Sequence, residues 1–598
     1  MSTEIRFLLA ILLMVAVLVV TNLLFPPIPQ EEMVGPPLED SLAVVMADSA
    51  DSEGEVTLGE SIVPAPSDTP EAALMAPQEG ATPETQAQVE DPFGGRLTGE
   101  DPREAEEAAS AAEALVVDGP LYTYTFSTRG ARLVSARLDD FPSLTFEGAV
   151  ELVRPESRGA LGTRLLVDGD TLDLRDLPFQ VEPEGGLVLA EGDSPQTLTF
   201  SYQHPTHPFN LRLSYTFYPD VYVVDVSGEV RGVDADLALT DLGTGIPFNE
   251  QRDRDEIRAA AYVVNHLQEG IRAERLDKVV GTQLEEGPFL WAAFKSKYFL
   301  MALLAGDSEE EERYLGGAIA TEVPNVEHGA DLSVAQSVSA NGSFDFRLFM
   351  GPQEFARLSN LGEDMQNVNP YGWRFFRPII RPFVGIIMAV LSFLHENLRI
   401  GYGWVLILFG VLMRVVLFPL NQKAMKSQMK NMAVQPLLQE VQAKYKDNPE
   451  KLQKEMMKLY KEHGFNPLGG CLPMLIPFPV LIALFFVFQN TIELRGVPFL
   501  WLPDLSAPDP LYILPAFLGI SMFLLQYVSM KSMPQTNPQM KMMMYVMPIM
   551  MVFIFFQLAS GLNLYYATAN IATLPQQIYI AKERKRQAAK APLTLSKD

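Results

Sequence analysis

Arg414 lies in the middle of a long apolar run, Gly401 to Leu420, which reads GYGWVLILFGVLMRVVLFPL. A guanidinium at bilayer depth costs at least a few kcal/mol, so it normally faces the interior of a helix bundle or a water-filled cavity. The other long apolar segments contain no Asp or Glu that could neutralise it. The chemistry that this predicts is electrostatic: a fixed cation that holds water or a polar substrate inside the membrane.

Polar side chains accompany Arg414 on two apolar segments. On its own segment, Gly410, Arg414 and Asn421 share one helical face. The last apolar segment carries a polar stripe at 3, 4, 3, 4 spacing: Asn563, Tyr566, Asn570, Thr573 and Gln577. Two such faces predict a polar-lined groove. Interhelical hydrogen bonding, worth under about 1 kcal/mol per contact, explains the stripe alone equally well, so both interpretations stay open for it.

The sequence argues against several classes of function. An ion-coupled transporter usually has carboxylates inside the membrane, and a nucleotide-driven pump needs a GxxxxGK[ST] phosphate loop; this chain has neither pattern. His204, His207 and His266 lie among acidic residues, but no spacing resembles a metal site or a catalytic triad. We therefore expect no enzyme, no metal and no cofactor. We also expect the process to be thermodynamically favourable without an added energy source.

Six apolar segments are each close to the roughly 20 residues that cross a hydrocarbon core. The first lies within residues 1–25 and is predicted to be an uncleaved signal anchor, because no small-x-small cleavage site follows it promptly; a cleavable signal peptide is the alternative. The other five segments are Gly401 to Leu420, Leu468 to Gln489, Leu511 to Ser529, Met542 to Ala559 and Leu562 to Ile580. The sequence predicts six spans.

The charge distribution predicts the topology. The formal net charge is −28, and residues 31–118 hold 22 acidic residues against two basic ones. From residue 423 to 598 there are instead 18 basic and 10 acidic residues. With the N-terminus inside, residues 26–400 lie outside and every Lys-rich connection lies inside, as the positive-inside rule requires. Both termini are therefore predicted to be cytoplasmic.

The exported part divides into a linker and a folded domain. Residues 26–115 are rich in Pro, Ala, Glu and Ser without apolar periodicity, which predicts a disordered acidic linker. Residues 116–355 contain alternating stretches such as Leu121 to Phe126 and Leu211 to Phe217, separated by Gly, Pro and Asp. This pattern is typical of an antiparallel β-sandwich. The fold class is thus an α-helical multi-span membrane protein with an exported β-sandwich.

Three further segments flank the spans. Residues 373–399 are apolar but interrupted by prolines, which favours an interfacial amphipathic helix, with a buried helix of the exported domain as the alternative. Residues 423–466 show two amphipathic stripes, the second starting at Asn448-Pro449-Glu450, and predict a helical hairpin. The hairpin and the basic tail, residues 583–598, suit docking of ribosomes, targeting factors or anionic lipid, or are simply solvated and positively charged.

Four motifs resemble the YidC membrane protein insertase family, in its Gram-negative form with a large periplasmic domain. They are VLMRVVLFPL around Arg414, NPLGGCLPMLIPFPVLIALF from Asn466, DPLYILPAFLGISMF from Asp509 and SGLNLYY from Ser560. The resemblance implies a five-span insertase core over residues 401–582, with a groove that opens to the cytoplasm around Arg414. It also implies that nascent chains contact Pro477, Phe478, Leu481 and Tyr566.

The resemblance further implies a location in the bacterial inner membrane and a set of partners. These are nascent membrane proteins, the Sec translocon with its accessory subunits, ribosomes and the targeting receptor, together with membrane lipids but no specific nucleic acid. The alternative functions are a channel or lipid-moving protein without insertase activity, and an assembly chaperone that binds finished spans.

Overall fold

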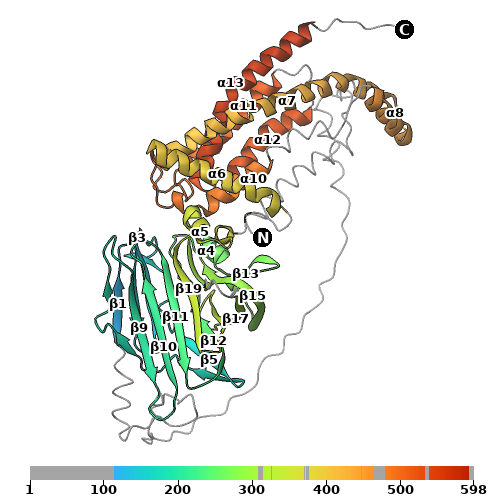
Figure 1. The fold of residues 1–598 in the computed structure, drawn as a ribbon. Helices are drawn as coiled ribbons and strands as arrows, with labels where there is room; N and C mark the ends of the chain where they lie inside the picture. The colour runs from blue at the N-terminus through green and yellow to red at the C-terminus, as the bar shows by residue number, and fades with distance from the viewer. Residues whose placement is uncertain are drawn as a thin grey trace, which may run out of the picture. The chain divides into compact units, whose positions relative to one another are not determined.

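The computed structural model describes residues 113–306, 314–324, 326–369, 371, 376–445, 448–462, 478–531 and 538–590 (Figure 1). The described residues up to 423 and from 478 onward belong to one compact unit, and those between 424 and 462 to another. The predicted first span, nearly all of the linker 26–115, Pro477 and the end of the basic tail lie outside the described ranges. The side chains of Asn421 and Phe478 lie outside them as well.

Two sheets form the β-sandwich. The smaller sheet has the order β4-β3-β2-β1-β8, and the larger one β6-β5-β12-β18-β17-β15-β16-β19-β11-β10-β9-β7, with β13 and β14 joined to it through β15. Described pairs are antiparallel except for the short β1–β8 pair, which is parallel. The predicted antiparallel sandwich is confirmed, with this one local departure.

The strands have the following bounds: β1 Ala114–Asp118, β2 Thr123–Ser127, β3 Arg132–Pro142, β4 Ala149–Glu151, β5 Thr163–Val167, β6 Asp170–Asp173, β7 Gln180–Glu182, β8 Leu187–Val188, β9 Gln196–Gln203, β10 Asn210–Phe217, β11 Val223–Arg231, β12 Ala235–Asp241, β13 Ala261–His266, β14 Gly270–Arg275, β15 Thr282–Lys295, β16 Phe299–Ala305, β17 Leu315–Glu322, β18 Ala330–Ser337 and β19 Ser343–Pro352.

The alternation seen in the sequence sets which side of each strand is buried. Along β10, Leu211, Leu213, Tyr215 and Phe217 are buried, while the residues between them are partly or fully exposed. The ring of Phe126 on β2 lies 5.2 Å from that of Tyr215, measured between centroids. Such aromatic contacts between sheets fill the interior of the sandwich. The core also takes in side chains after the last strand: Leu358, Met365 and Val368.

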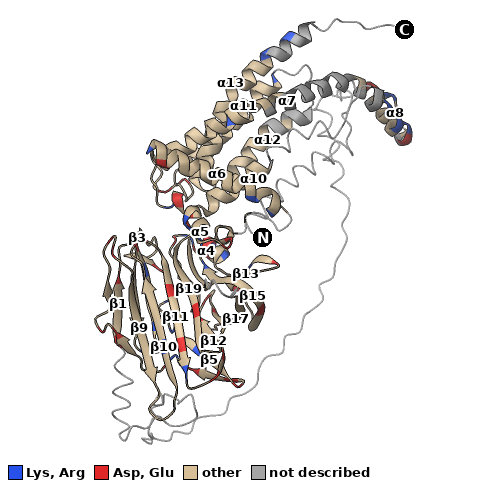
Figure 2. Ribbon diagram, in the orientation of Figure 1, with Lys and Arg blue, Asp and Glu red and all other residues tan. Residues whose placement is uncertain are grey.

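The helices have these bounds: α4 Asp253–Ala259, α5 Phe355–Leu361, α6 Arg377–Leu398, α7 Tyr402–Lys444, α8 Pro449–Glu462, α10 Phe478–Asn490, α11 Ile513–Met530, α12 Pro538–Phe555 and α13 Ser560–Lys590, with 3-10 turns η2 Leu276–Lys278, η3 Met365–Asn367 and η4 Ile492–Leu494. Helices α6, α10, α11 and α12 carry few charged residues where they are described (Figure 2).

Within the described residues, three helices are long and apolar enough to cross a membrane: α6, α11 and residues Tyr402–Pro419 of α7. Two shorter apolar helices, Pro479–Asn490 and Tyr545–Phe555, belong to α10 and α12. Helix α13 is not among them, because polar residues interrupt its apolar sequence. The structure thus contains a helix at each of the five predicted later spans, while the count of six spans stays a prediction.

Helix α6 occupies the segment 373–399 that we predicted to lie in the interface. One face buries Ile380, Val384, Ile387 and Leu391, and the other exposes Ile386 and Phe393 at 61% each. The helix packs against α10. It is amphipathic as predicted, but its length and composition also suit a crossing, so its interfacial placement stays a prediction.

The predicted hairpin 423–466 is helical in its described part. Helix α7 continues from the apolar segment to Lys444 without a break, and α8 follows from Pro449. The Asn448 side-chain oxygen accepts a hydrogen bond from the Lys451 N–H at 3.2 Å. The N-cap at Asn448 and the proline at the first helical position are therefore confirmed.

Candidate functional site

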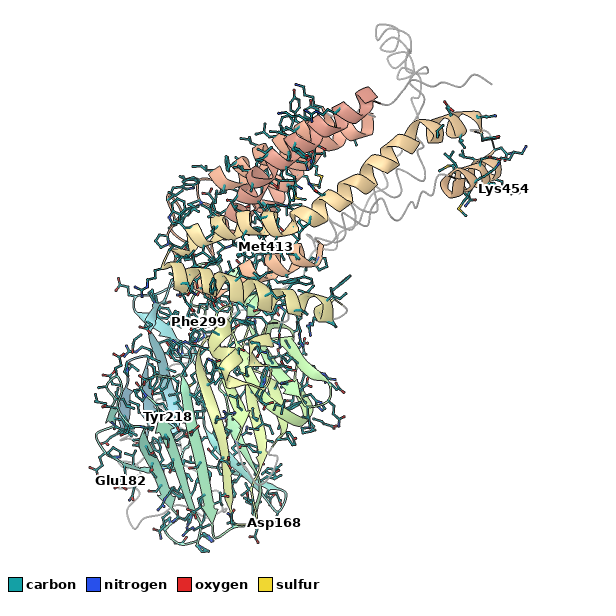
Figure 3. All side chains as sticks on the ribbon, turned by 45° about the horizontal axis from the view of Figure 1, so that its top comes forward. Asp168, Glu182, Tyr218, Phe299, Met413 and Lys454 are labelled. Carbon is teal, nitrogen blue, oxygen red and sulfur yellow. The ribbon has the colours of Figure 1, made fainter. Side chains whose placement is uncertain are left out.

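Arg414 lies on α7 beside a cavity of about 580 Å³ (Met413, the preceding residue, is labelled in Figure 3). Its side chain is half-buried, and the buried Nε atom has no hydrogen-bond partner. Among the residues that the structure describes, no Asp or Glu forms an ion pair with it.

Two helices line this cavity. The lining residues are Val411, Arg414, Val415, Phe418 and Gln422 on α7, and Ala572, Pro575, Gln576 and Tyr579 on α13. Both sets follow the three- and four-residue spacing of one helical face. Val415 and Tyr579 are 65% and 61% exposed, which makes the cavity an open groove rather than an enclosed chamber.

Helices α7 and α13 touch directly one turn before the cavity. A Cβ atom at Gly410 would lie 3.3 Å from Thr568 Cγ2 and 3.4 Å from the Tyr565 carbonyl oxygen. The Phe409 and Tyr565 rings add a contact at 5.7 Å between centroids. The sequence placed Gly410 on the helical face of Arg414, where a residue without a side chain could leave space. Its space is instead taken by α13, so the glycine permits the close approach of the two helices.

The predicted polar stripe of α13 does not line this cavity. Asn563 donates a hydrogen bond to the Phe555 carbonyl at 3.1 Å, Asn570 donates to Ser521 Oγ at 3.1 Å, and Thr573 donates to the Ala569 carbonyl at 2.6 Å. Tyr566 packs edge-on against Phe555, with ring centroids 5.2 Å apart. These contacts match the packing interpretation, which the sequence left open.

The face of α13 toward Arg414 differs from the predicted one by one position. Gln576 lines the cavity, whereas Gln577 does not. Successive residues on a helix with 3.6 residues per turn are separated by about 100°. The pair of glutamines was visible in the sequence, but the rotation of α13 about its axis was needed to choose between them.

The predicted contacts for nascent chains are only partly described. Leu481 is half-buried on α10, which begins at Phe478, and Tyr566 is half-buried on α13. Neither Leu481 nor Tyr566 lines the cavity beside Arg414.

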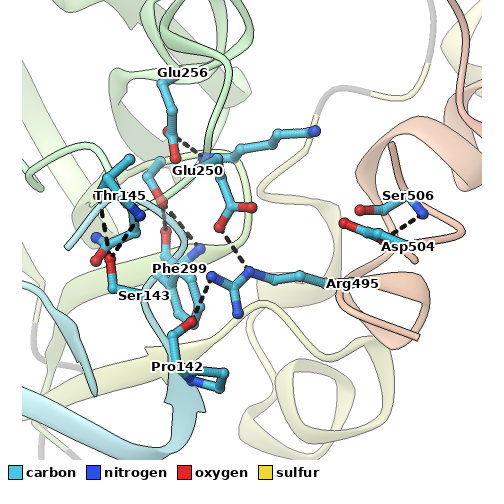
Figure 4. Close-up of polar contacts among 12 residues, drawn as sticks. Pro142, Ser143, Thr145, Glu250, Glu256, Phe299, Arg495, Asp504 and Ser506 are labelled. Atoms are coloured by element: carbon cyan, nitrogen blue, oxygen red, sulfur yellow. Dashed lines mark hydrogen bonds and ion pairs between the residues drawn. The ribbon is translucent and has the colours of Figure 1, made fainter. Parts of the chain in front are cut away.

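Sequence reasoning missed a second, very different arginine. Arg495 lies between α10 and α11, and its Nε donates to Glu250 Oε1 at 2.6 Å (Figure 4). Its Nη2 donates to the Pro142 carbonyl at 2.9 Å, and its guanidinium lies 5.3 Å from the centre of the Phe299 ring. The Arg495 and Glu250 side chains are only 4% and 6% exposed. No local signal marked this pair, since its members are 245 residues apart.

The segment that holds Arg495 also contacts the helices. Ser560 and Gly561, at the start of α13, donate hydrogen bonds to the carbonyls of Ala507 and Leu505 at 2.6 and 2.8 Å. On the sandwich side, Glu256 lies near Glu250 and is fully buried. Burial and the neighbouring Glu250 raise the pKa of Glu256 to about 7. The junction between the Arg495 segment and the sandwich therefore holds two buried carboxyl groups, and Arg495 forms its hydrogen bond with Glu250.

The histidines of the sandwich form no metal site in the part of the chain that the structure describes. His204 Nδ1 accepts hydrogen bonds from the N–H groups of Thr206 and His207 at 3.2 and 3.0 Å, which stabilises a local turn.

Two protein families match successive parts of this chain. Residues 393–588 match the family described as 60Kd inner membrane protein, and residues 114–385 match the YidC periplasmic domain. A crystal structure of an active YidC insertase with its first transmembrane domain resolved aligns over 79% of this chain and 96% of its own, with 19% identity and a TM-score of 0.32.

Curated relatives extend over most of the chain. The membrane protein insertase YidC of Prosthecochloris aestuarii is 33% identical over 494 residues, which cover 78% of this chain and 82% of the relative. That of Chlorobaculum tepidum is 31% identical over 551 residues, covering 87% and 89%. The chain belongs to the YidC family of membrane protein insertases, multi-span proteins of the bacterial inner membrane.

Proposed function

We propose that this insertase works through a groove that opens to the cytoplasm and has its polar centre at the cavity between α7 and α13. One observation carries the proposal: Arg414 brings a buried, unsatisfied donor to a cavity of about 580 Å³. A cation in this position costs free energy unless water or a polar ligand solvates it. The proposed ligand is the polar flank of an incoming membrane segment.

The reaction needs no fuel in this account. Partition of the client's apolar segment into lipid supplies a few tenths of a kcal/mol for each Leu, Ile or Phe. The barrier is the passage of the polar flank across the hydrocarbon core. Arg414 and the water around it would shorten the dry part of that path, and its charge would favour acidic flanks. The protein would act without a catalytic reaction.

The proposed topology follows from charge. Both termini are cytoplasmic, the first span is an uncleaved anchor, and residues 26–400 with the sandwich are periplasmic, in keeping with the positive-inside rule. The helices over residues 423–466 and the basic tail would then reach ribosomes, the targeting receptor or anionic lipid. Cooperation with the Sec translocon belongs to the same proposal.

The client's apolar segment is proposed to leave along the helices next to the groove. The proposed contacts are Phe478 and Leu481 on α10, Pro477, which precedes them in the sequence, and Tyr566 on α13. Asn421 adds polarity at the cytoplasmic side of Arg414. The members of the α13 stripe are proposed to contribute mainly through helix packing, because three of them donate hydrogen bonds to groups of α11, α12 and α13.

The test uses the full-length protein in lipid vesicles and a single-span client with an acidic exported flank. Arg414→Ala should slow insertion of this client by about tenfold, since hydrogen bonds to charged groups are worth roughly 1.5–3 kcal/mol. Arg414→Lys should retain most of the activity. Val416→Ala is a matched control, because Val416 is 59% exposed on the same helix and does not line the cavity.

Equal insertion of the acidic client by Arg414→Ala and wild-type protein would contradict the electrostatic role of Arg414. Flux of small solutes or lipids through vesicles that contain no client would instead support a channel or a lipid-moving protein.

A further inference from the structure

A second unsatisfied donor lies in the same cavity as Arg414. The Gln576 side chain lines the cavity from α13, and its Nε2 atom is buried without a hydrogen-bond partner. Buried polar groups in folded proteins are nearly always hydrogen-bonded, so an orphaned one requires an explanation. Here two helices each bring an orphaned donor, one charged and one neutral, to one groove.

Two prolines interrupt the backbone hydrogen bonding of the helices that line the cavity. In an α-helix the N–H of each residue bonds to the carbonyl four residues earlier, and proline has no N–H. Pro575 lies inside α13 and lines the cavity, so the Ile571 carbonyl loses its helical donor. Pro419 does the same for the carbonyl of Val415, a lining residue of α7. Pro575 and Val415 line the cavity, so each proline removes one backbone donor from a helix that borders the groove.

We infer that the cavity binds the unpaired main chain of the client's polar flank, with Gln576 donating to its carbonyl oxygens. Each residue of an unfolded main chain offers a C=O acceptor that the orphaned donors of the groove can bind. This inference rests on the proposed insertase groove and specifies what it recognises.

The two donors, Arg414 and Gln576, then contribute to client binding in different ways. Arg414 provides a charge-dependent attraction that favours acidic flanks, whereas Gln576 provides a contact that depends on neither charge nor side-chain identity. Such a contact suits a protein whose clients share a polypeptide backbone and little sequence. It also predicts that a flank already folded into a helix gains less, because its main-chain groups are bonded to each other.

The experiment compares Gln576→Met with Gln577→Met in the full-length protein in vesicles. Both substitutions replace an amide with an apolar side chain of similar length, at neighbouring positions, and only Gln576 lines the cavity. The probes are two single-span clients with uncharged exported flanks of equal length. One flank is Gly/Ser-rich and stays unfolded, while the other is Ala/Gln-rich and forms a helix.

Gln576→Met should slow insertion of the Gly/Ser client roughly two- to tenfold, the range that one neutral hydrogen bond supplies. The Ala/Gln client should be slowed less, and Gln577→Met should leave both rates unchanged. Gln576→Glu loses the donor and also brings a carboxylate into the cavity of Arg414, so it should slow the Gly/Ser client at least as much as Gln576→Met.

Three results would overturn the inference: equal effects of the two Met variants, equal slowing of both clients by Gln576→Met, or wild-type rates with Gln576→Glu. The acidic client with Arg414→Ala tests the proposed function separately. If that client is slowed while Gln576→Met has no effect, the proposed function of the groove is supported and main-chain recognition is contradicted. If Gln576→Met slows the Gly/Ser client while Arg414→Ala changes nothing, main-chain recognition stands and the electrostatic role of Arg414 fails.

Discussion

Arg495 and Arg414 are the same side chain in two opposite situations. Arg495 is 4% exposed and has a carboxylate, a carbonyl and an aromatic ring as neighbours. Arg414 is half-buried beside an open cavity, with an orphaned Nε and no carboxylate partner among the described residues. The first arginine completes a contact between a loop and the sandwich. The second has a buried Nε that finds no partner among the residues that the structure describes.

The difference distinguishes Arg495, which stabilises the fold, from Arg414, which we propose to bind the client. Removing one member of a buried ion pair leaves the other charge buried and uncompensated, which is strongly destabilising. Removing a charge that has no protein partner relieves a cost instead. The same substitution at both positions should therefore give opposite results for stability and activity.

The largest effect is expected for Arg495→Met. This change leaves Glu250 buried at 6% exposure without its partner, so the free energy of unfolding should fall by about 3–5 kcal/mol. Thermal unfolding of the purified protein measures it. The double variant Arg495→Met/Glu250→Leu should regain most of the loss, since a buried pair can be replaced by apolar groups. An unchanged melting temperature in Arg495→Met would show that the pair is not a stabilising contact.

The next effect is a pH dependence at the same junction. Burial raises the pKa of Glu256 from 4.5 to about 7, so the folded protein binds a proton that the unfolded chain releases. Stability should therefore fall as the pH rises from about 4.5 through 7, on the order of 3 kcal/mol in total. Glu256→Gln should flatten much of this dependence in unfolding measurements at pH 5 and pH 8. A variant whose stability changes with pH as steeply as wild type would exclude Glu256 as the source.

A smaller effect is expected for Asn570→Ala. The substitution removes the hydrogen bond to Ser521 at 3.1 Å, and such bonds between membrane helices average about 0.6 kcal/mol. The melting temperature should fall slightly while insertion of the acidic client stays at the wild-type rate. A large loss of insertion without loss of stability would show that Asn570 contributes to the groove, as the sequence suggested.

The sequence was sufficient wherever a local pattern determines the structure. Alternation predicted β10 and its buried face, the Asn448-Pro449 pair predicted the start of α8, and a lone charge in an apolar run identified Arg414. In each case the physical cause lies within a few neighbouring residues. These features could be predicted because burial and capping follow strand and helix periodicity.

The features that were missed depend on relations between distant segments. Choosing Gln576 over Gln577 requires knowing how α13 is rotated about its axis relative to α7. The periodicity of the α13 sequence does not specify this rotation. The Arg495–Glu250 pair joins ordinary charged residues 245 positions apart. Gly410 was correctly placed on the face of Arg414, but what fills the space beside it depends on how closely α13 approaches.

The most direct test of the account measures stability and insertion together in Arg414→Met, with Arg495→Met as its counterpart. The account predicts that Arg414→Met unfolds at or above the wild-type temperature and inserts the client with an acidic flank about tenfold more slowly. A fall in stability comparable to that of Arg495→Met, or a normal insertion rate, would contradict the claim that Arg414 is kept unpaired for the client.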